Sequence, residues 1–217
     1  MIITIDGPSG TGKTTVAKMV AERLGIDYFD TGAMYRLVTY LVLQRRISLL
    51  DHVELEKVLD FFVKNFEIKA GRYFIQGRDL TLEIRSQEVN SAVSDVSAIT
   101  LVRESLWKIQ RAFAEKGDAV FEGRDMGTVV FPQAEIKIFL TASPEVRARR
   151  RMNEMLSKHP ELTEEQVLKD LEQRDRKDST RKLAPLCCPD DAYQVDTSGL
   201  LIDEVVEKVI QYKAARV

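Results

Sequence analysis

The residues best suited to chemistry are the glycines, lysine and threonine of the segment GPSGTGKT, at positions 7–14. The segment fits the pattern G-x-x-x-x-G-K-[ST], with an apolar run before it and a helix-compatible run after it. Glycines let successive backbone N–H groups turn toward phosphate oxygens, and a helix N-terminus adds partial positive charge. In this pattern Lys13 bridges the β- and γ-phosphates, and the Thr14 hydroxyl holds Mg²⁺. We predict a nucleoside triphosphate site formed by Gly7, Pro8, Ser9, Gly10, Thr11, Gly12, Lys13, Thr14 and Thr15.

A second polar group follows the next short apolar run, in the segment DTGAMYR at positions 30–36. Ligands of doubly wound sheets bind beyond the carboxyl ends of the strands, so we expect this segment to open beside the phosphates. Asp30 or Thr31 could simply cap a helix, which is a frequent use of both residue types. Capping does not explain Arg36, which lies one turn further and could make a bidentate contact with an acceptor phosphate.

A third group, EGRDMG at positions 122–127, follows another apolar run. It places Arg124 and Asp125 at the end of a strand, where the same crevice is expected. The simpler alternative is an ordinary turn with a solvated ion pair. We favour a functional role, because position and charge lead to the same edge of the sheet.

Clustered arginines form the last group. Arg147, Arg149, Arg150 and Arg151 fall on one predicted helix, and Arg174, Asp178 and Arg181 follow at i, i+4 and i+7 of another. We interpret Arg149 as part of a solvated face. A transferring phosphoryl group spreads negative charge over its oxygens, and guanidinium groups on a mobile lid would neutralise that charge while excluding water. We therefore expect functional roles for Arg174, Asp178 and Arg181, and also for Arg147, Arg150 and Arg151.

The elements that must position these motifs indicate an α/β fold of the P-loop type. Strand patterns occupy residues 2–6, 28–30, 119–122, 135–140 and 193–196. Helical patterns occupy residues 13–24, 34–43, 101–115, 144–156, 164–181 and 202–214. Because strands alternate with helices, we expect a five-stranded parallel sheet covered on both faces. We treat residues 1–217 as a single P-loop domain with a lid region at 147–182.

Residues 65–84, NFEIKAGRYFIQGRDLTLEI, interrupt the alternation of strands and helices. Their period-2 pattern, with turn signals at residues 70–71 and 77–78, predicts an antiparallel meander inside an insert lobe at 64–95. The insert could be a decoration of a surface loop or a lobe that binds the acceptor. The pattern alone leaves both interpretations open.

The composition argues against a nucleic acid, a membrane or zinc as a partner of the chain. The 217 residues carry a formal net charge of −2, so no basic excess favours a nucleic acid polymer. No run approaches the ~20 apolar residues that span a membrane. Cys187 and Cys188 are adjacent, and with only two histidines, His52 and His159, no zinc-ligand spacing is present. We expect a cytoplasmic protein and a monomer, with both histidines on the surface and the cysteines incidental.

Taken together, GPSGTGKTT, DTGAMYR, FEGRDMGTVVFP, EIKIFL and RDRKDSTRKLAP resemble the bacterial cytidylate kinase family, in that family's order and across nearly the whole chain. The resemblance implies a P-loop core, a mobile lid and a nucleoside monophosphate lobe enlarged by a small antiparallel sheet. It also implies phosphorylation of CMP and dCMP by ATP with Mg²⁺. Thr31 stands where serine is commoner in the family, which adds a methyl group near the acceptor.

The resemblance assigns roles to individual residues. Thr31, Tyr35 and Arg36 match contacts near the acceptor, and Ser94, Arg103 and Asp125 match the residues that read cytosine. Arg124, Arg174 and Arg181 match residues facing the phosphates, and Asp178 together with Arg174 matches a pair near the sugar. The catalytic set implied is Lys13, Arg36, Arg124, Arg174 and Arg181.

The chemistry of the base supports a cytosine acceptor independently. Cytosine offers an exocyclic N4 donor that suits the Asp125 carboxylate, whereas uracil presents an acceptor there and would be disfavoured. The acceptor phosphate is already ionised near neutral pH, so no strong general base is required. Two alternatives remain: a kinase for UMP, AMP or a hydroxyl compound, and a regulatory module that senses or hydrolyses ATP.

Overall fold

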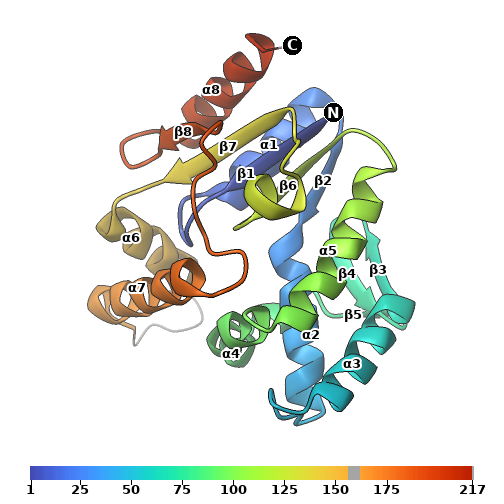
Figure 1. The fold of residues 1–217 in the computed structure, drawn as a ribbon. Helices are drawn as coiled ribbons and strands as arrows, with labels where there is room; N and C mark the ends of the chain where they lie inside the picture. The colour runs from blue at the N-terminus through green and yellow to red at the C-terminus, as the bar shows by residue number, and fades with distance from the viewer. Residues whose placement is uncertain (156–161, 217) are drawn as a thin grey trace. The chain divides into compact units, whose positions relative to one another are not determined.

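A computed structural model describes residues 1–155 and 162–216 of the chain. The chain divides into two compact units (Figure 1). Unit 1 comprises Met1–Tyr28 and Gly117–Val217, and unit 2 is the continuous segment Phe29–Lys116. None of the helices in the described ranges is long and apolar enough to cross a membrane.

The sheet is parallel, and its order is β2-β6-β1-β7-β8. β1 pairs in parallel with both β6 and β7, and β8 extends the sheet beside β7. All five strands match the sequence prediction to within one or two residues. The strands are β1 (Ile2–Asp6), β2 (Asp27–Asp30), β6 (Ala119–Gly123), β7 (Ile136–Thr141) and β8 (Tyr193–Asp196).

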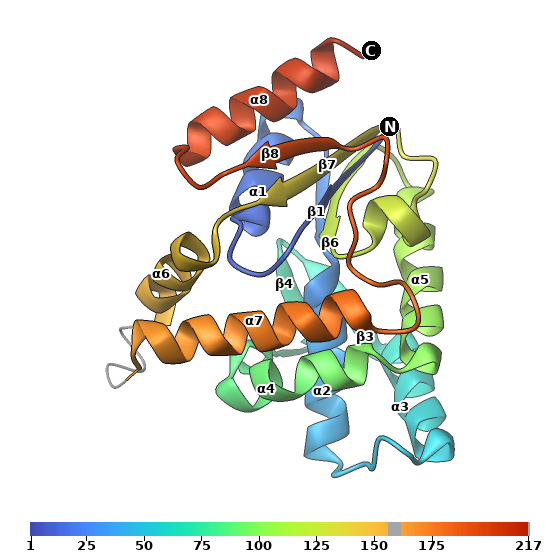
Figure 2. The same ribbon diagram turned by 60° about the vertical axis from the view of Figure 1, so that its left-hand side comes forward.

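Two helices cover one face of this sheet, α1 (Lys13–Leu24) and α8 (Ile202–Ala214) (Figure 2). Their buried residues, such as Val16 and Val209, join Ile3 and Ile5 of β1 in one hydrophobic core. Side chains alternate along a strand, so Thr4 and Asp6 point to the opposite face. That alternation places an acid at the carboxyl end of β1 on the face away from α1.

A second helix pair, α6 (Pro144–Met155) and α7 (Glu164–Thr180), packs through a small cluster around Ala148, Val167 and Leu171. Thr163 and Gln166 form a capping box that begins α7. The helix ends one residue earlier than predicted. Arg181 has extended backbone dihedrals because the chain turns back there, with the Leu186 N–H donating to the Asp178 carbonyl at 2.8 Å. Residues 156–161 of the predicted lid, and the end of the predicted helix 144–156, lie outside the described residues.

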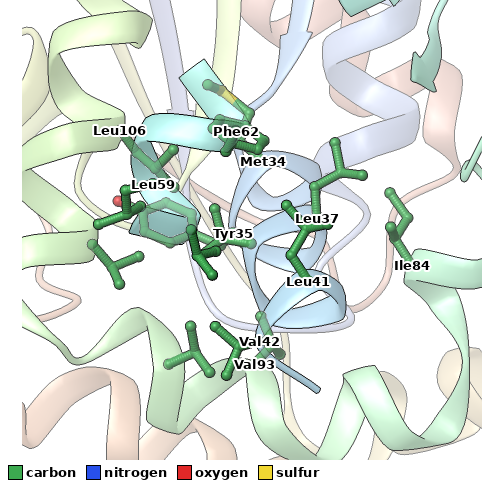
Figure 3. Packing of buried hydrophobic residues seen from close by; sticks show 14 of the residues in the cluster. Met34, Tyr35, Leu37, Leu41, Val42, Leu59, Phe62, Ile84, Val93 and Leu106 are labelled. Carbon is green, nitrogen blue, oxygen red and sulfur yellow. The ribbon is translucent and has the colours of Figure 1, made fainter. Parts of the chain in front are cut away.

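Unit 2 is built around α2 (Thr31–Gln44). The other helices are α3 (His52–Asn65), α4 (Gln87–Ser97) and α5 (Thr100–Ala114), with a short 3₁₀ turn, η1 (Glu83–Arg85). Figure 3 shows Met34 of α2 beside Phe62 of α3 and Leu106 of α5, whereas Leu37 lies on the side of α2 that faces Ile84. This core is separate from that of the parallel sheet.

The predicted meander is present as an antiparallel sheet, β3 (Phe66–Lys69), β4 (Arg72–Ile75) and β5 (Arg78–Asp79). Ala70 and Gly71 have positive φ in the first turn, as the sequence indicated. The second turn lies one residue earlier than expected, at Gln76 and Gly77. The sequence pattern did not predict α3 or α4.

Candidate active site

The phosphate-binding loop joins the carboxyl end of β1 to the first residue of α1. Gly7, Gly10 and Gly12 all have positive φ, so the loop uses the backbone freedom that its glycines provide. The Thr11 hydroxyl donates to the Pro8 carbonyl at 3.0 Å, and the Lys13 ammonium donates to the same oxygen at 2.6 Å. The loop therefore closes around the lysine that the sequence assigns to phosphate binding.

Lys13 lies in a crowded ionic environment. Burial, together with the positive charge of Arg124, lowers the pKa of Lys13 from 10.5 to about 7. The carboxylates of Glu122 and Asp6 act in the opposite direction. An anion bound in the loop would offset the cost of holding this ammonium away from water.

Glu122 is a site residue that the sequence analysis missed. Its carboxylate accepts from the Thr14 hydroxyl at 3.0 Å and from the Tyr28 hydroxyl at 2.5 Å. Two neutral hydroxyls thus converge on one buried acid beside the loop. An all-oxygen set of hydroxyl and carboxylate suits Mg²⁺, which takes one or two protein ligands beside substrate phosphates. The signal that could have found Glu122 is its position as an acidic residue near the carboxyl end of a predicted strand.

A network of arginines and aspartates lies at the end of β6 and the end of α7. Arg124 Nε donates to Asp178 Oδ2 at 3.0 Å. Arg181 lies 4.0 Å from Asp178 Oδ1 and 3.7 Å from Asp125 Oδ1. Burial opposes ionisation of Asp178, yet Arg124, Arg174 and Arg181 outweigh it and lower the pKa of that carboxyl. The network brings together residues of two separate predicted groups, the segment at 122–127 and the helix that carries Arg174, Asp178 and Arg181.

Arg174 is the member of this network most obviously prepared for an anion. Burial and the neighbouring Arg124 lower the pKa of Arg174 to about 10. Its Nε is buried and has no hydrogen-bond partner within residues 1–155 and 162–216. A donor of this kind costs free energy until an acceptor arrives.

The predicted acceptor residues of unit 2 lie on three of its helices. Asp30 caps α2 by accepting from the Ala33 N–H, so the simple capping role is confirmed for that residue. Arg36 donates to Asn90 Oδ1 at 2.5 Å and to the Ile84 carbonyl at 3.3 Å. These bonds orient its guanidinium within unit 2.

Arg103 of α5 is 1% exposed and donates from Nη1 to the Ser97 carbonyl. Its guanidinium lies 5.2 Å from the ring centre of Tyr35, which Figure 3 shows on α2. Ser94, on α4, and Thr31, the first residue of α2, are both buried. Unit 2 therefore brings Tyr35 and Arg103 together, two of the predicted acceptor residues.

The arginines of α6 differ from one another. Arg147 is buried, donates to the Ser9 carbonyl of the loop at 3.1 Å and pairs with Asp175. Arg150 donates to the hydroxyl and the carbonyl of Thr197, and Arg151 pairs with Glu154. Arg149 is exposed, which confirms its interpretation as a solvated residue. Of the four, Arg147 contacts the phosphate-binding loop.

A family model described as cytidylate kinase matches residues 3–215. The chain belongs to the cytidylate kinase family. A cytidylate kinase of Protochlamydia amoebophila is 53% identical over 98% of this chain and 96% of its own length. Another, from Fervidobacterium nodosum, is 49% identical over 96% of this chain and 94% of its own length. The family is one of phosphotransferases, and the resemblance drawn from the motifs is confirmed.

Among solved structures, an uncharacterised protein of Eubacterium ventriosum covers 100% of this chain with a TM-score of 0.55. At 14% sequence identity this likeness concerns the fold alone. The α/β architecture predicted from the sequence is thus confirmed, while the individual site roles remain predictions.

Proposed function

We propose that this cytidylate kinase family member transfers the γ-phosphoryl group of ATP to CMP and dCMP. The bond between γ-phosphorus and the β–γ bridging oxygen breaks, and a bond from that phosphorus to a phosphate oxygen of the acceptor forms. ADP leaves with the bridging oxygen, so the products are ADP and CDP or dCDP. The observation that carries this proposal is the cation cluster of Lys13, Arg124, Arg174 and Arg181 around the loop and the end of α7.

The donor half of the proposal rests on the phosphate-binding loop. Its amides and Lys13 hold the triphosphate, and Arg174 and Arg181 stabilise the charge on the transferring group. Thr14 and Glu122 would hold Mg²⁺, which supplies charge neutralisation on the phosphate oxygens when it is bound. Positioning and electrostatics suffice because the acceptor oxygen is already ionised.

The acceptor half assigns recognition to two groups of residues. In unit 2 we propose Thr31, Tyr35 and Arg36 for the acceptor phosphate, and Ser94 with Arg103 for the base. In unit 1 we propose Asp125 for the N4 amino group of cytosine, with Arg124 at the phosphate and Asp178 near the sugar. A carboxylate facing N4 would face the O4 acceptor of uracil instead, which explains the expected selectivity.

The test is ADP formation by purified protein from ATP and Mg²⁺, with CMP, dCMP, UMP and AMP offered separately. We expect rapid turnover with CMP and dCMP and weak turnover with UMP and AMP. A preference for UMP or AMP would overturn the cytosine assignment. ATP loss that is independent of any monophosphate would favour the regulatory alternative.

A cytoplasmic location and a monomeric state are further parts of the proposal. Light scattering of the purified protein tests the monomeric state.

A further inference from the structure

A single helical turn, η2 (Met126–Val130), follows Arg124 and Asp125 in the chain. Asp125 is the N-cap residue of this turn, yet its side chain makes no capping hydrogen bond. The hydrogen-bond acceptor that caps η2 belongs instead to Asp6 of β1. Oδ1 of Asp6, at the carboxyl end of β1, accepts from the Met126 N–H at 3.0 Å, and Oδ2 accepts from the Gly127 N–H at 2.8 Å.

This arrangement departs from the capping used elsewhere in the chain. Asp30 caps α2 and Asp51 caps α3, each through its own side chain. An aspartate at an N-cap normally accepts a backbone N–H of its own first turn, which directs its carboxylate back onto the helix. In η2 the Asp6 carboxylate accepts these N–H groups, so the Asp125 carboxylate does not cap its own turn.

We propose that Asp6 is a positioning residue for the acceptor base: it caps η2 in place of Asp125, so that the Asp125 carboxylate is kept for the N4 amino group of the acceptor. This inference rests on the proposed role of Asp125. It assigns no contact between Asp6 and the substrate. Asp6 acts through the backbone of Met126 and Gly127.

The packing around η2 shows how the position of Asp125 is held. The Asp125 carbonyl accepts from the Val129 and Val130 N–H groups at 2.9 and 3.1 Å. A Cβ added at Gly127 would lie 3.0 Å from Thr4 Oγ1 and 3.4 Å from Asp6 Oδ2. The backbone just after Asp125 is therefore hydrogen-bonded and tightly enclosed. The Asp125 side chain is 2% exposed, and its Oδ1 lies 3.7 Å from the Arg181 guanidinium.

The capping residue must be a carboxylate to satisfy both amides. An asparagine in place of Asp6 could accept from one N–H, but its own NH₂ group would face the other donor. Burial works against the charged form and raises the pKa of Asp6 from 3.8 to about 6. The two backbone hydrogen bonds lower that pKa and so favour the ionised form. Assays well above this pH keep Asp6 ionised.

The experiment compares steady-state kinetics for CMP and UMP in four proteins: wild type, Asp125→Ala, Asp6→Asn and the double variant. Losing one charge-assisted bond predicts that Asp6→Asn lowers kcat/KM for CMP by roughly 10- to 100-fold. The ratio of kcat/KM for CMP over UMP should fall in Asp6→Asn as it falls in Asp125→Ala. In the double variant the ratio should fall no further than in Asp125→Ala. The KM for ATP should change by less than about threefold.

Two further variants control for folding. Asp51→Asn makes the same substitution at a helix cap in unit 2, and it should leave the CMP-to-UMP ratio at its wild-type value. Gly127→Ala crowds the same turn against Thr4, Pro189 and the capping carboxylate of Asp6, and it should reproduce the loss of discrimination. Amide hydrogen exchange at Met126 and Gly127 should accelerate in Asp6→Asn.

Each result bears on one inference. If Asp125→Ala keeps the wild-type preference for CMP, the proposed cytosine role of Asp125 is wrong. If Asp125→Ala loses the preference and Asp6→Asn keeps it, the positioning role of Asp6 is wrong. Equal losses for CMP and UMP in Asp6→Asn would show a structural role alone and would also overturn the inference. Should Asp6→Asn fail to fold, Gly127→Ala decides between the same outcomes.

Discussion

The ionised carboxylate of Asp6 caps η2, but its burial lowers the stability of the folded protein. It is 1% exposed, and burial is the main reason that its pKa is raised to about 6. A carboxyl whose pKa is higher in the folded than in the unfolded chain favours folding while protonated, below about pH 3.8. That contribution is lost as pH rises through about 6. At neutral pH the ionised form therefore lowers stability while it caps η2.

We predict that Asp6→Asn removes this pH dependence. Between about pH 4.5 and pH 8, the free energy of unfolding of the wild type should fall by about 2 kcal/mol relative to Asp6→Asn. Urea unfolding of both proteins across this range measures the difference, with Asp51→Asn as the matched control. A constant difference between wild type and Asp6→Asn would contradict the prediction.

At the residue scale, sequence reasoning found the side chains that belong to recognisable patterns. Lys13 was assigned from the P-loop spacing, and Arg124 with Asp125 from a glycine-flanked pair after a strand. Glu122 and Asp6 were missed, because their roles depend on which hydroxyls and amides they meet. Thr14 lies 108 residues from Glu122 in the chain, and Met126 lies 120 residues from Asp6. No local pattern encodes such partners.

At the element scale, the end of β1 is enclosed by β7. A Cβ added at Gly7 would lie 2.2 Å from the Leu140 carbonyl oxygen, which is backbone of β7. Gly25, which ends α1, also has positive φ, but a Cβ there would meet nothing within 4 Å. A side chain at Gly25 would strain only the backbone conformation, whereas a side chain at Gly7 would also clash with β7.

We predict different losses for the same substitution at these two glycines. Gly25→Ala should cost about 1 kcal/mol of unfolding free energy, from the left-handed conformation alone. Gly7→Ala should cost at least about 3 kcal/mol, because two paired strands must separate to admit the methyl group. Thermal or urea unfolding measures both. Similar losses in the two variants would mean that the loop relaxes around the added methyl.

Elements with strong local signals were predicted well. The ranges for α1 and α8 match to the residue, because glycines and polar turns limit them. The helices α3 and α4 were missed although Asp51 and Ser86 cap them. In α4 the sequence QEVNSAVSDVS is rich in residues with weak helix propensity, so its helix depends on the buried Val89 and Val93.

At the scale of the whole molecule, unit 2 is one continuous stretch of chain with its own core. The rings of Phe29 and Phe113, near its two ends, stack with centroids 4.8 Å apart. A segment whose ends meet and whose apolar residues are already covered has the features of an independent folding unit.

We predict that the isolated fragment 29–116 folds cooperatively. Its circular dichroism should be helical, and its urea unfolding should show a single sigmoidal transition. A shorter fragment, 29–98, lacks Val102 and Leu106 of the core and should show none. A broad, uncooperative transition for the longer fragment would mean that its stability depends on the rest of the chain.

The two adjacent cysteines after α7 differ in a way that is useful for spectroscopy. Cys187 is exposed, whereas Cys188 is partly buried, and burial raises the pKa of its thiol despite a hydrogen bond from Gln194. Maleimide dyes react with the thiolate, so limited labelling of the natural chain should modify Cys187 first. Peptide mass spectrometry checks the site, with Cys187→Ser as the control. Leu186, next to the dye, donates its N–H to the Asp178 carbonyl, so fluorescence would report directly on that segment as nucleotides bind.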